Sequence, residues 1–386
     1  MRTIMDYLAE EFATFDEVPF CAVDALVLSE FCMVRMERVL PPMREEKAIG
    51  GRATARLKAL FSGKRGVHFK DALMAEHFDG MFTGLIPDKV RALMFALAAS
   101  PRFRDVEMSE CASVFDEGAR TQFAALSFSY KNEFAFVSFR GTDCSFTGWR
   151  EDFDMAYMNR VPAQESAVRY LDAVASRLPK TLYVGGHSKG GNLAMYAAAK
   201  CASKVRSRID RVFSFDAPGF RRDALSEGEW RSLTSSVERY VPRESLIGML
   251  MEHPVPCAVV QSNLAGAWQH DPFSWGVDGF DFARCSGLSS SAQFTHDVVN
   301  RWLARYDEKQ ARAIVDALFE AMKASGAQDF SDMLKFGPQT LGMLRDAAKN
   351  TDEETRSILM SALGDLAEVA ARRAWYGQEK TEARRK

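Results

Sequence analysis

Near the middle of the chain, a strand-like segment runs directly into a glycine-flanked serine and then into an alanine-rich helix. The apolar run TLYVG at residues 181–185 precedes Gly186-His187-Ser188-Lys189-Gly190, and a helix-forming run follows over residues 191–199. A β-carbon two residues to either side of the serine would collide with the adjoining strand or helix, so the two glycines permit a sharp turn. The G-x-S-x-G pattern in this setting predicts a nucleophilic serine, Ser188, at a strand-to-helix turn.

Composition narrows the class of protein. The chain has 386 residues and a formal net charge of -2, which gives no electrostatic case for nucleic acid as a partner. No apolar run is long enough to span a bilayer, and the acidic first residues do not resemble a signal peptide. The seven cysteines are scattered and odd in number, without a C-x-x-C pair. We therefore expect reduced thiols, no metal site and a cytoplasmic location.

The periodicity of the chain predicts three regions. Residues 1–118 are expected to form a helical segment that packs on a core of residues 119–287, and residues 288–386 a helical extension. In the core, residues 123–130 alternate, 131–133 turn and 134–139 form a second strand, which predicts a hairpin. Strands near 181–185, 211–215, 237–241 and 258–260 then alternate with helices. This order predicts an α/β fold with a mostly parallel sheet, whose active groups lie beyond the carboxyl ends of the strands.

A serine nucleophile needs a base, and the chain offers six histidines. His187 adjoins the serine, where consecutive side chains diverge, and two others lie in the N-terminal region. Among the rest, His270 follows its own strand after a short loop, as the order serine, acid, histidine requires. We assign the base to His270, with His253 as the alternative.

The acid that would orient the base has two candidates at strand ends. Glu244 follows the strand at 237–241 and has the favoured topological position, whereas Asp216 follows the strand at 211–215. Either carboxylate has a structural explanation as well, since such residues often cap the next helix. The sequence favours Glu244 and leaves Asp216 open.

The oxyanion hole is expected to use the backbone N–H of Lys189, the residue after the nucleophile. A second donor should come from the loop after the strand at 134–139, which carries Arg140-Gly141-Thr142-Asp143. Gly141 would let the backbone approach the substrate, and Thr142 would donate through its backbone or its hydroxyl.

These motifs resemble a known family. The Phe139-Arg140-Gly141-Thr142 loop, with Trp149 a short helix later, and the Gly186–Gly191 elbow are similar to fungal-type class 3 triacylglycerol lipases. The chain more closely resembles a bacterial group of lipase-like α/β-hydrolases that is classified as a domain of unknown function. The matching stretches are residues 19–28, 241–250 and 269–275. The resemblance covers most of the chain to about residue 330. It implies an α/β-hydrolase fold with Ser188 as nucleophile and His270 as base.

The sequence departs from those lipases at two positions. Glu244 falls where they carry an aspartate, and Lys189 replaces their usual leucine, which puts a cation next to the nucleophile in sequence. We expect a serine hydrolase that cleaves a carboxylic ester and needs no cofactor. Two alternatives remain open: a thioesterase or amidase with the same residues, and a catalytically weak binding module whose C-terminal helices meet a partner protein.

Overall fold

The computed structural model describes residues 1–43, 66–324 and 351–383, with side chains up to residue 373. Its centre is an eight-stranded sheet whose spatial order, β1 to β8, follows the chain. The pairs from β1 to β4 are antiparallel and those from β4 to β8 are parallel. The strands are β1 (Val67–His68), β2 (Val106–Asp116), β3 (Thr121–Tyr130), β4 (Phe134–Phe139), β5 (Thr181–His187), β6 (Ile209–Phe215), β7 (Val237–Pro242) and β8 (Ala258–Val260).

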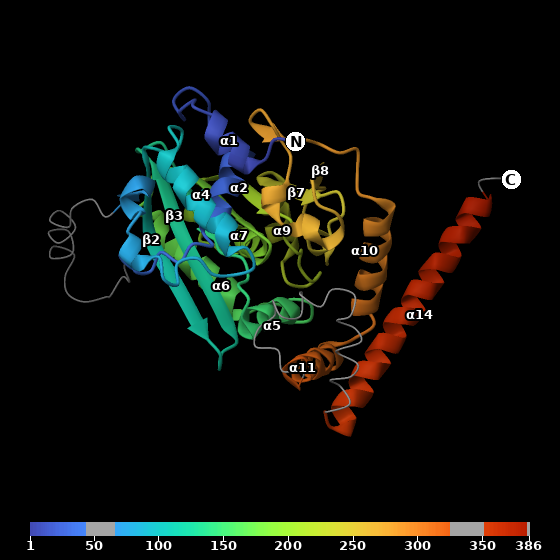
Figure 1. Cartoon of the computed structure of the whole chain (residues 1–386). Helices are drawn as coiled ribbons and strands as arrows, with labels where there is room; N and C mark the ends of the chain where they lie inside the picture. Colours follow the sequence, from blue (N-terminus) through green and yellow to red (C-terminus); the bar gives the residue numbers. More distant parts are fainter. Residues whose placement is uncertain (44–65, 325–350, 384–386) are drawn as a thin grey trace.

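Helices cover both faces of this sheet (Figure 1). Successive side chains of a strand point to opposite faces, so Phe134 and Phe136 of β4 enter one apolar core while Ala135 and Val137 enter the other. The first core includes α1 (Ile4–Glu10), α2 (Ala22–Phe31) and α4 (Pro87–Ala99). The second includes α6 (Pro162–Ala175), α7 (Lys189–Lys200), α8 (Ser203–Arg206) and α9 (Glu227–Thr234). This arrangement confirms the predicted α/β-hydrolase fold with a mostly parallel sheet.

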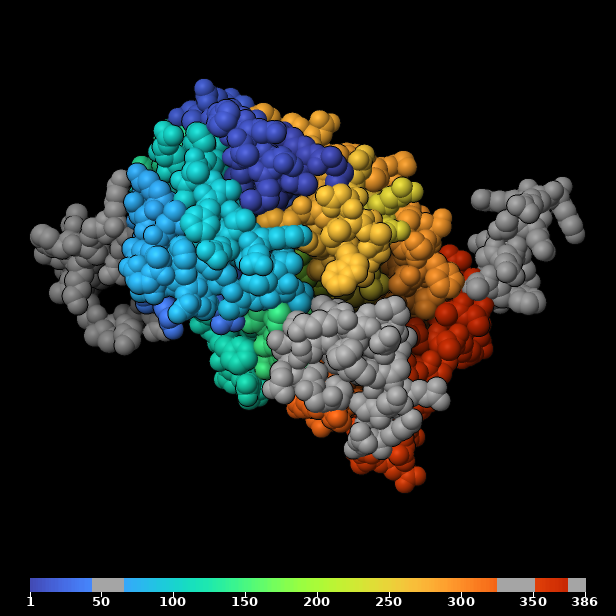
Figure 2. Space-filling model, viewed as in Figure 1, coloured from blue at the N-terminus to red at the C-terminus, as the bar shows by residue number. Residues whose placement is uncertain are grey.

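The sheet begins earlier in the chain than expected. The predicted hairpin of β3 and β4 is present, but β2 lies before residue 119 and pairs with β3 along most of its length. The N-terminal residues also contact a segment late in the chain, because the Val277 N–H donates to the Arg2 carbonyl at 2.8 Å. Figure 2 shows the blue N-terminal residues beside orange ones. The predicted N-terminal segment is therefore packed into the hydrolase core and supplies β1 and β2 to its sheet.

Short elements shape the loops after β7 and β8. They are the 3₁₀ turns η3 (Ile247–Met249), η4 (Gly266–His270) and η5 (Pro272–Ser274), and a small ribbon of β9 (Val277–Asp278) with β10 (Asp281–Phe282). Two further turns, η1 (Phe69–Ala72) and η2 (Ala75–His77), follow β1. The η4 turn carries His270, so the base predicted from the sequence lies on a short turn near the carboxyl edge of the sheet.

The C-terminal region is helical where it is described, as predicted, and consists of α10 (Ser290–Leu303), α11 (Glu308–Ala324) and α14 (Glu353–Ala383). Residues 325–350 of the predicted extension lie outside the described residues. Phe319 of α11 packs on α5 (Phe146–Asp154), and Figure 1 shows the two helices side by side. Asn300 of α10 binds the loop after β7 through Met249 and Met251. Within the described ranges, no helix has the length and hydropathy of a membrane span.

Candidate active site

Ser188 stands at the turn between β5 and α7, as the motif predicts. Its backbone has φ 55° and ψ −129°, a conformation that a non-glycine residue seldom adopts and that is typical of functional sites. A β-carbon on Gly186 would lie 2.4 Å from the Gly190 carbonyl carbon, and one on Gly190 would lie 2.1 Å from the Phe139 oxygen. The sharp turn therefore requires glycine at both positions.

His270 lies against this serine. Its Nε2 is 3.0 Å from Ser188 Oγ, within hydrogen-bond distance. The alternative base, His253, lies elsewhere, with both of its ring nitrogens buried. Burial holds the pKa of His253 well below its usual value, so that ring is neutral. The structure brings the favoured histidine, and not its alternative, to the serine.

The carboxylate beside His270 is Asp216, not the favoured Glu244. His270 Nδ1 lies 2.6 Å from Asp216 Oδ2, and Asp216 is fully buried. The other Asp216 oxygen accepts hydrogen bonds from Ser245 Oγ at 2.5 Å and from the Gly248 N–H at 3.1 Å. With both oxygens occupied, the carboxylate has one fixed orientation toward the imidazole.

Glu244 instead supports the turn that carries the histidine. Its carboxylate accepts hydrogen bonds from the Gly266 N–H at 2.5 Å and from Gln269 Nε2 at 3.2 Å. The physical reason is strand order: β6, which ends just before Asp216, is the direct neighbour of β5, whereas β7 is one strand further from the serine. The preference for Glu244 as the partner of His270 is therefore corrected in favour of Asp216.

The predicted oxyanion loop lies against the serine turn. A β-carbon on Gly141 would be 3.1 Å from the His187 carbonyl oxygen and 3.8 Å from Ser188 Cβ. The Thr142 hydroxyl donates to Asp152 Oδ2 at 2.5 Å. Because that hydroxyl proton is engaged, the backbone N–H of Thr142 is the better candidate donor to a substrate. Burial raises the pKa of Asp152 to about 6, against the opposing effect of the nearby Lys189 ammonium.

The Lys189 side chain points into the protein instead of toward the reacting side of Ser188. It is 1% exposed, and its Nζ donates to the Gln122 carbonyl at 2.9 Å, to Gln122 Oε1 at 2.7 Å and to Glu151 Oε2 at 3.1 Å. Glu151 of α5 also accepts from the N–H groups of Gln122 and Ala163. This buried ion pair joins α7, α5, α6 and β3 beneath the oxyanion loop.

Replacing Lys189 by methionine is expected to lower the free energy of unfolding by about 3–5 kcal/mol, because the Glu151 carboxylate would stay buried without its cation. Urea denaturation followed by circular dichroism would measure this loss. The exposed Lys204 of α8, replaced by methionine in the same way, is the matched control and should change stability little. Equal stability of the two variants would contradict a structural role for the buried pair.

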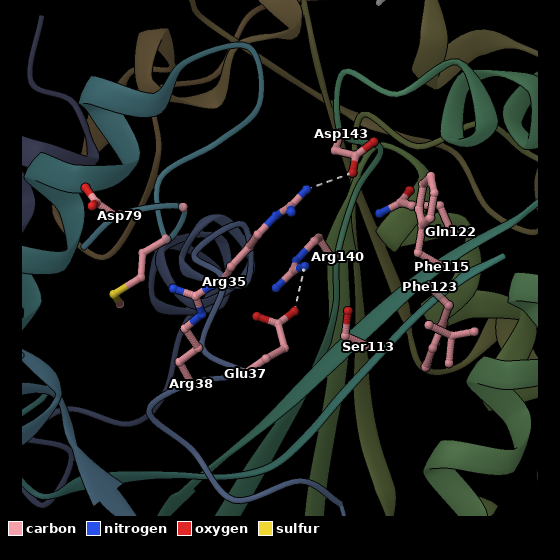
Figure 3. A pocket seen from close by; sticks show the side chains of 13 residues that line it. Arg35, Glu37, Arg38, Asp79, Ser113, Phe115, Gln122, Phe123, Arg140 and Asp143 are labelled. Carbon is pink, nitrogen blue, oxygen red and sulfur yellow. Dashed lines mark hydrogen bonds and ion pairs between the residues drawn. The ribbon is translucent and has the colours of Figure 1, made fainter. Parts of the chain in front are cut away.

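A cavity of about 380 Å³ lies next to the oxyanion loop (Figure 3). Arg140 and Asp143, which flank Gly141 and Thr142, are among its lining residues. Arg35 donates to Asp143 at 3.2 Å, and Arg140 donates to Glu37 at 3.4 Å. The Arg140 guanidinium also binds carbonyl oxygens just after α2. Neither Ser188 nor His270 lines this cavity, so its walls hold the loop and do not form the reacting site.

Comparisons with known proteins give the family. The model of the Mbeg1-like family matches residues 97–320, more than half of the chain. The chain belongs to the Mbeg1-like family. The matched residues of this Mbeg1-like chain include Ser188, Asp216 and His270.

Two solved lipases were found among structural matches to this Mbeg1-like chain. M37 lipase is 16% identical with a TM-score of 0.30, and the match covers 42% of this chain and 63% of that one. A deletion mutant of the Rhizomucor miehei lipase propeptide complex is 13% identical with a TM-score of 0.33, and the match covers 62% of this chain and 93% of that one. The search of curated proteins found no match.

Proposed function

We propose that this chain is a serine hydrolase that cleaves a carboxylic ester through an acyl-enzyme intermediate. The observation that carries the proposal is the row of hydrogen-bond distances from Asp216 Oδ2 to His270 Nδ1, 2.6 Å, and from His270 Nε2 to Ser188 Oγ, 3.0 Å. The His270 side chain is 29% exposed and the Asp216 side chain is fully buried. A substrate can thus reach the imidazole from solvent while the acid stays shielded.

Each residue has a defined chemical role in this proposal. The Ser188 oxygen attacks the ester carbonyl as its proton passes to His270 Nε2, and the resulting imidazolium is stabilised by the Asp216 carboxylate. The backbone N–H groups of Lys189 and Thr142 donate to the oxyanion. His270 then gives the proton to the leaving alcohol. Water attacks the acyl-serine by the same proton transfers in reverse, which restores the free serine.

The type of bond that is cleaved and the cellular location of the protein are also matters of proposal. The same groups attack thioesters and amides, so these remain the alternative substrates. The binding-module alternative has two grounds, the uncertain acid and the long C-terminal helical extension. The short distance from Asp216 to His270 speaks against the first ground. A small-molecule ester, a cytoplasmic location and membership of the bacterial group stay predictions.

The proposed nucleophile can be tested with a fluorophosphonate probe, which reacts with activated serines. We expect one label per chain, located on the peptide that contains Ser188 by mass spectrometry, and no label on heat-denatured protein. Matched p-nitrophenyl ester, thioester and anilide substrates would then identify the bond. Absence of label on the folded protein, or label on another serine, would contradict the proposal.

A further inference from the structure

His187 precedes the serine and lies beside the row without being part of it. Its ring centroid is 4.6 Å from that of His270, at an interplanar angle of 39°. Its Nδ1 is 3.1 Å from Glu30 Oε1 on α2. The side chains of His187 and Glu30 are 14% and 2% exposed, so both groups are largely withdrawn from water. An ionisable pair of this kind, in ring contact with the base, is not needed to form the turn.

The groups that face His187 are mostly acidic. Glu30 approaches from α2, Asp216 from the end of β6, and His270 and Asp271 from the η4 turn and the residue after it. Asp271 is itself paired with Lys89 of α4. The Trp275 ring also lies near the imidazole, almost perpendicular to it, with 6.5 Å between centroids.

This environment favours a charged His187. Burial on its own lowers the pKa of the imidazole, but the Glu30 carboxylate, with smaller contributions from Asp216 and Asp271, outweighs it and the net shift is upward. A cationic His187 also compensates the buried Glu30 carboxylate, which would otherwise be unpaired and costly.

We propose that Glu30 and His187 form a charged pair that sets the lower pH limit of the reaction, by opposing a second positive charge on His270. This inference rests on the proposed serine hydrolase function. Two imidazolium rings in contact repel each other, so with His187 charged the base loses its proton at lower pH and remains active in more acidic solution. Glu30 and His187 act through His270 and are positioning residues that touch no substrate.

The test is the pH profile of kcat/KM for a p-nitrophenyl ester in Glu30→Gln, His187→Gln and the double variant. Glu30→Gln removes the counterion and leaves His187 neutral, and His187→Gln removes the cation directly. In each case the midpoint of the acid limb should move up by about 0.5 to 1 pH unit. Glu110→Gln, which alters an acidic residue of β2 that pairs with Arg177, is the matched control and should leave the midpoint in place.

The outcomes separate this inference from the function on which it rests. A uniform loss of rate with an unmoved midpoint, or a midpoint that moves down, would overturn the pair's role while leaving the hydrolase intact. No ester turnover by the native protein would overturn the function itself. If the variants do not fold, the ¹⁵N chemical shifts of the His187 imidazole in the unmodified protein give the protonation state of that ring directly. A neutral His187 at pH 6 would overturn the proposal without any activity measurement.

Discussion

Replacing Ser188 by alanine is expected to lower kcat for ester hydrolysis on the order of 10⁶-fold, as removal of a serine nucleophile does in well-studied hydrolases. Without the hydroxyl there is no atom to form the acyl intermediate, and His270 has no proton to accept. Hydrolysis of p-nitrophenyl butyrate under saturating substrate would measure the loss.

The control for this experiment is Ser176→Ala, which removes an exposed hydroxyl at the end of α6. Both variants should show native circular dichroism and the same thermal midpoint to within a few degrees. Turnover by Ser188→Ala above about one hundredth of the native rate, with a folded protein, would show that another group attacks the ester.

Replacing Asp216 by asparagine is expected to lower kcat about 10⁴-fold. Asparagine keeps the shape of the side chain, but its amide N–H would face His270 Nδ1 and favour the wrong imidazole tautomer. It would also leave the developing imidazolium without its counter-charge. The loss should appear in kcat with little change in KM, because Asp216 is buried behind the base and does not contact substrate.

Glu244→Gln is the matched comparison, because it makes the same chemical change at the residue that the sequence favoured. The native Glu244 carboxylate accepts hydrogen bonds from Gly266 and Gln269, and the amide oxygen of glutamine can retain one of them. We expect a loss of less than about tenfold. The reverse ranking, with Glu244→Gln nearly inactive and Asp216→Asn active, would assign the acid to Glu244 and contradict the geometry of the site.

The elements that sequence patterns predicted well are those with local causes. The hairpin of β3 and β4 follows from the alternation of residues 123–130, the polar turn at 131–133 and the apolar run at 134–139, and the turn at Ser188 follows from glycines at 186 and 190. In contrast, β2 has no regular period, because a bulge between Ser109 and Ala112 inserts an extra residue and Glu110 adopts φ 53°. One extra residue moves the following side chains to the other face, and the alternation that indicates a strand is lost.

The fates of Glu244 and Lys189 could not be determined from the sequence for a different reason. Each candidate acid lies at a strand end in sequence, and the sequence pattern could not resolve which one the imidazole reaches. The same is true of Lys189, which follows the nucleophile in sequence, because its side chain turns inward to bind Gln122 and Glu151. A side chain's direction depends on partners that lie far away in the chain.

By itself, the sequence determined the serine turn, the parallel α/β order and the histidine that follows the last strand of the large sheet, because backbone conformation and apolar periodicity are properties of neighbouring residues. The tertiary structure alone decided that Asp216 partners His270, that Thr142 is bound by Asp152, and that Glu30 of α2 meets His187. These contacts join residues 10 to 157 positions apart. Only the folded sheet brings such residues within hydrogen-bond distance, since no local preference of the chain encodes the distance between them.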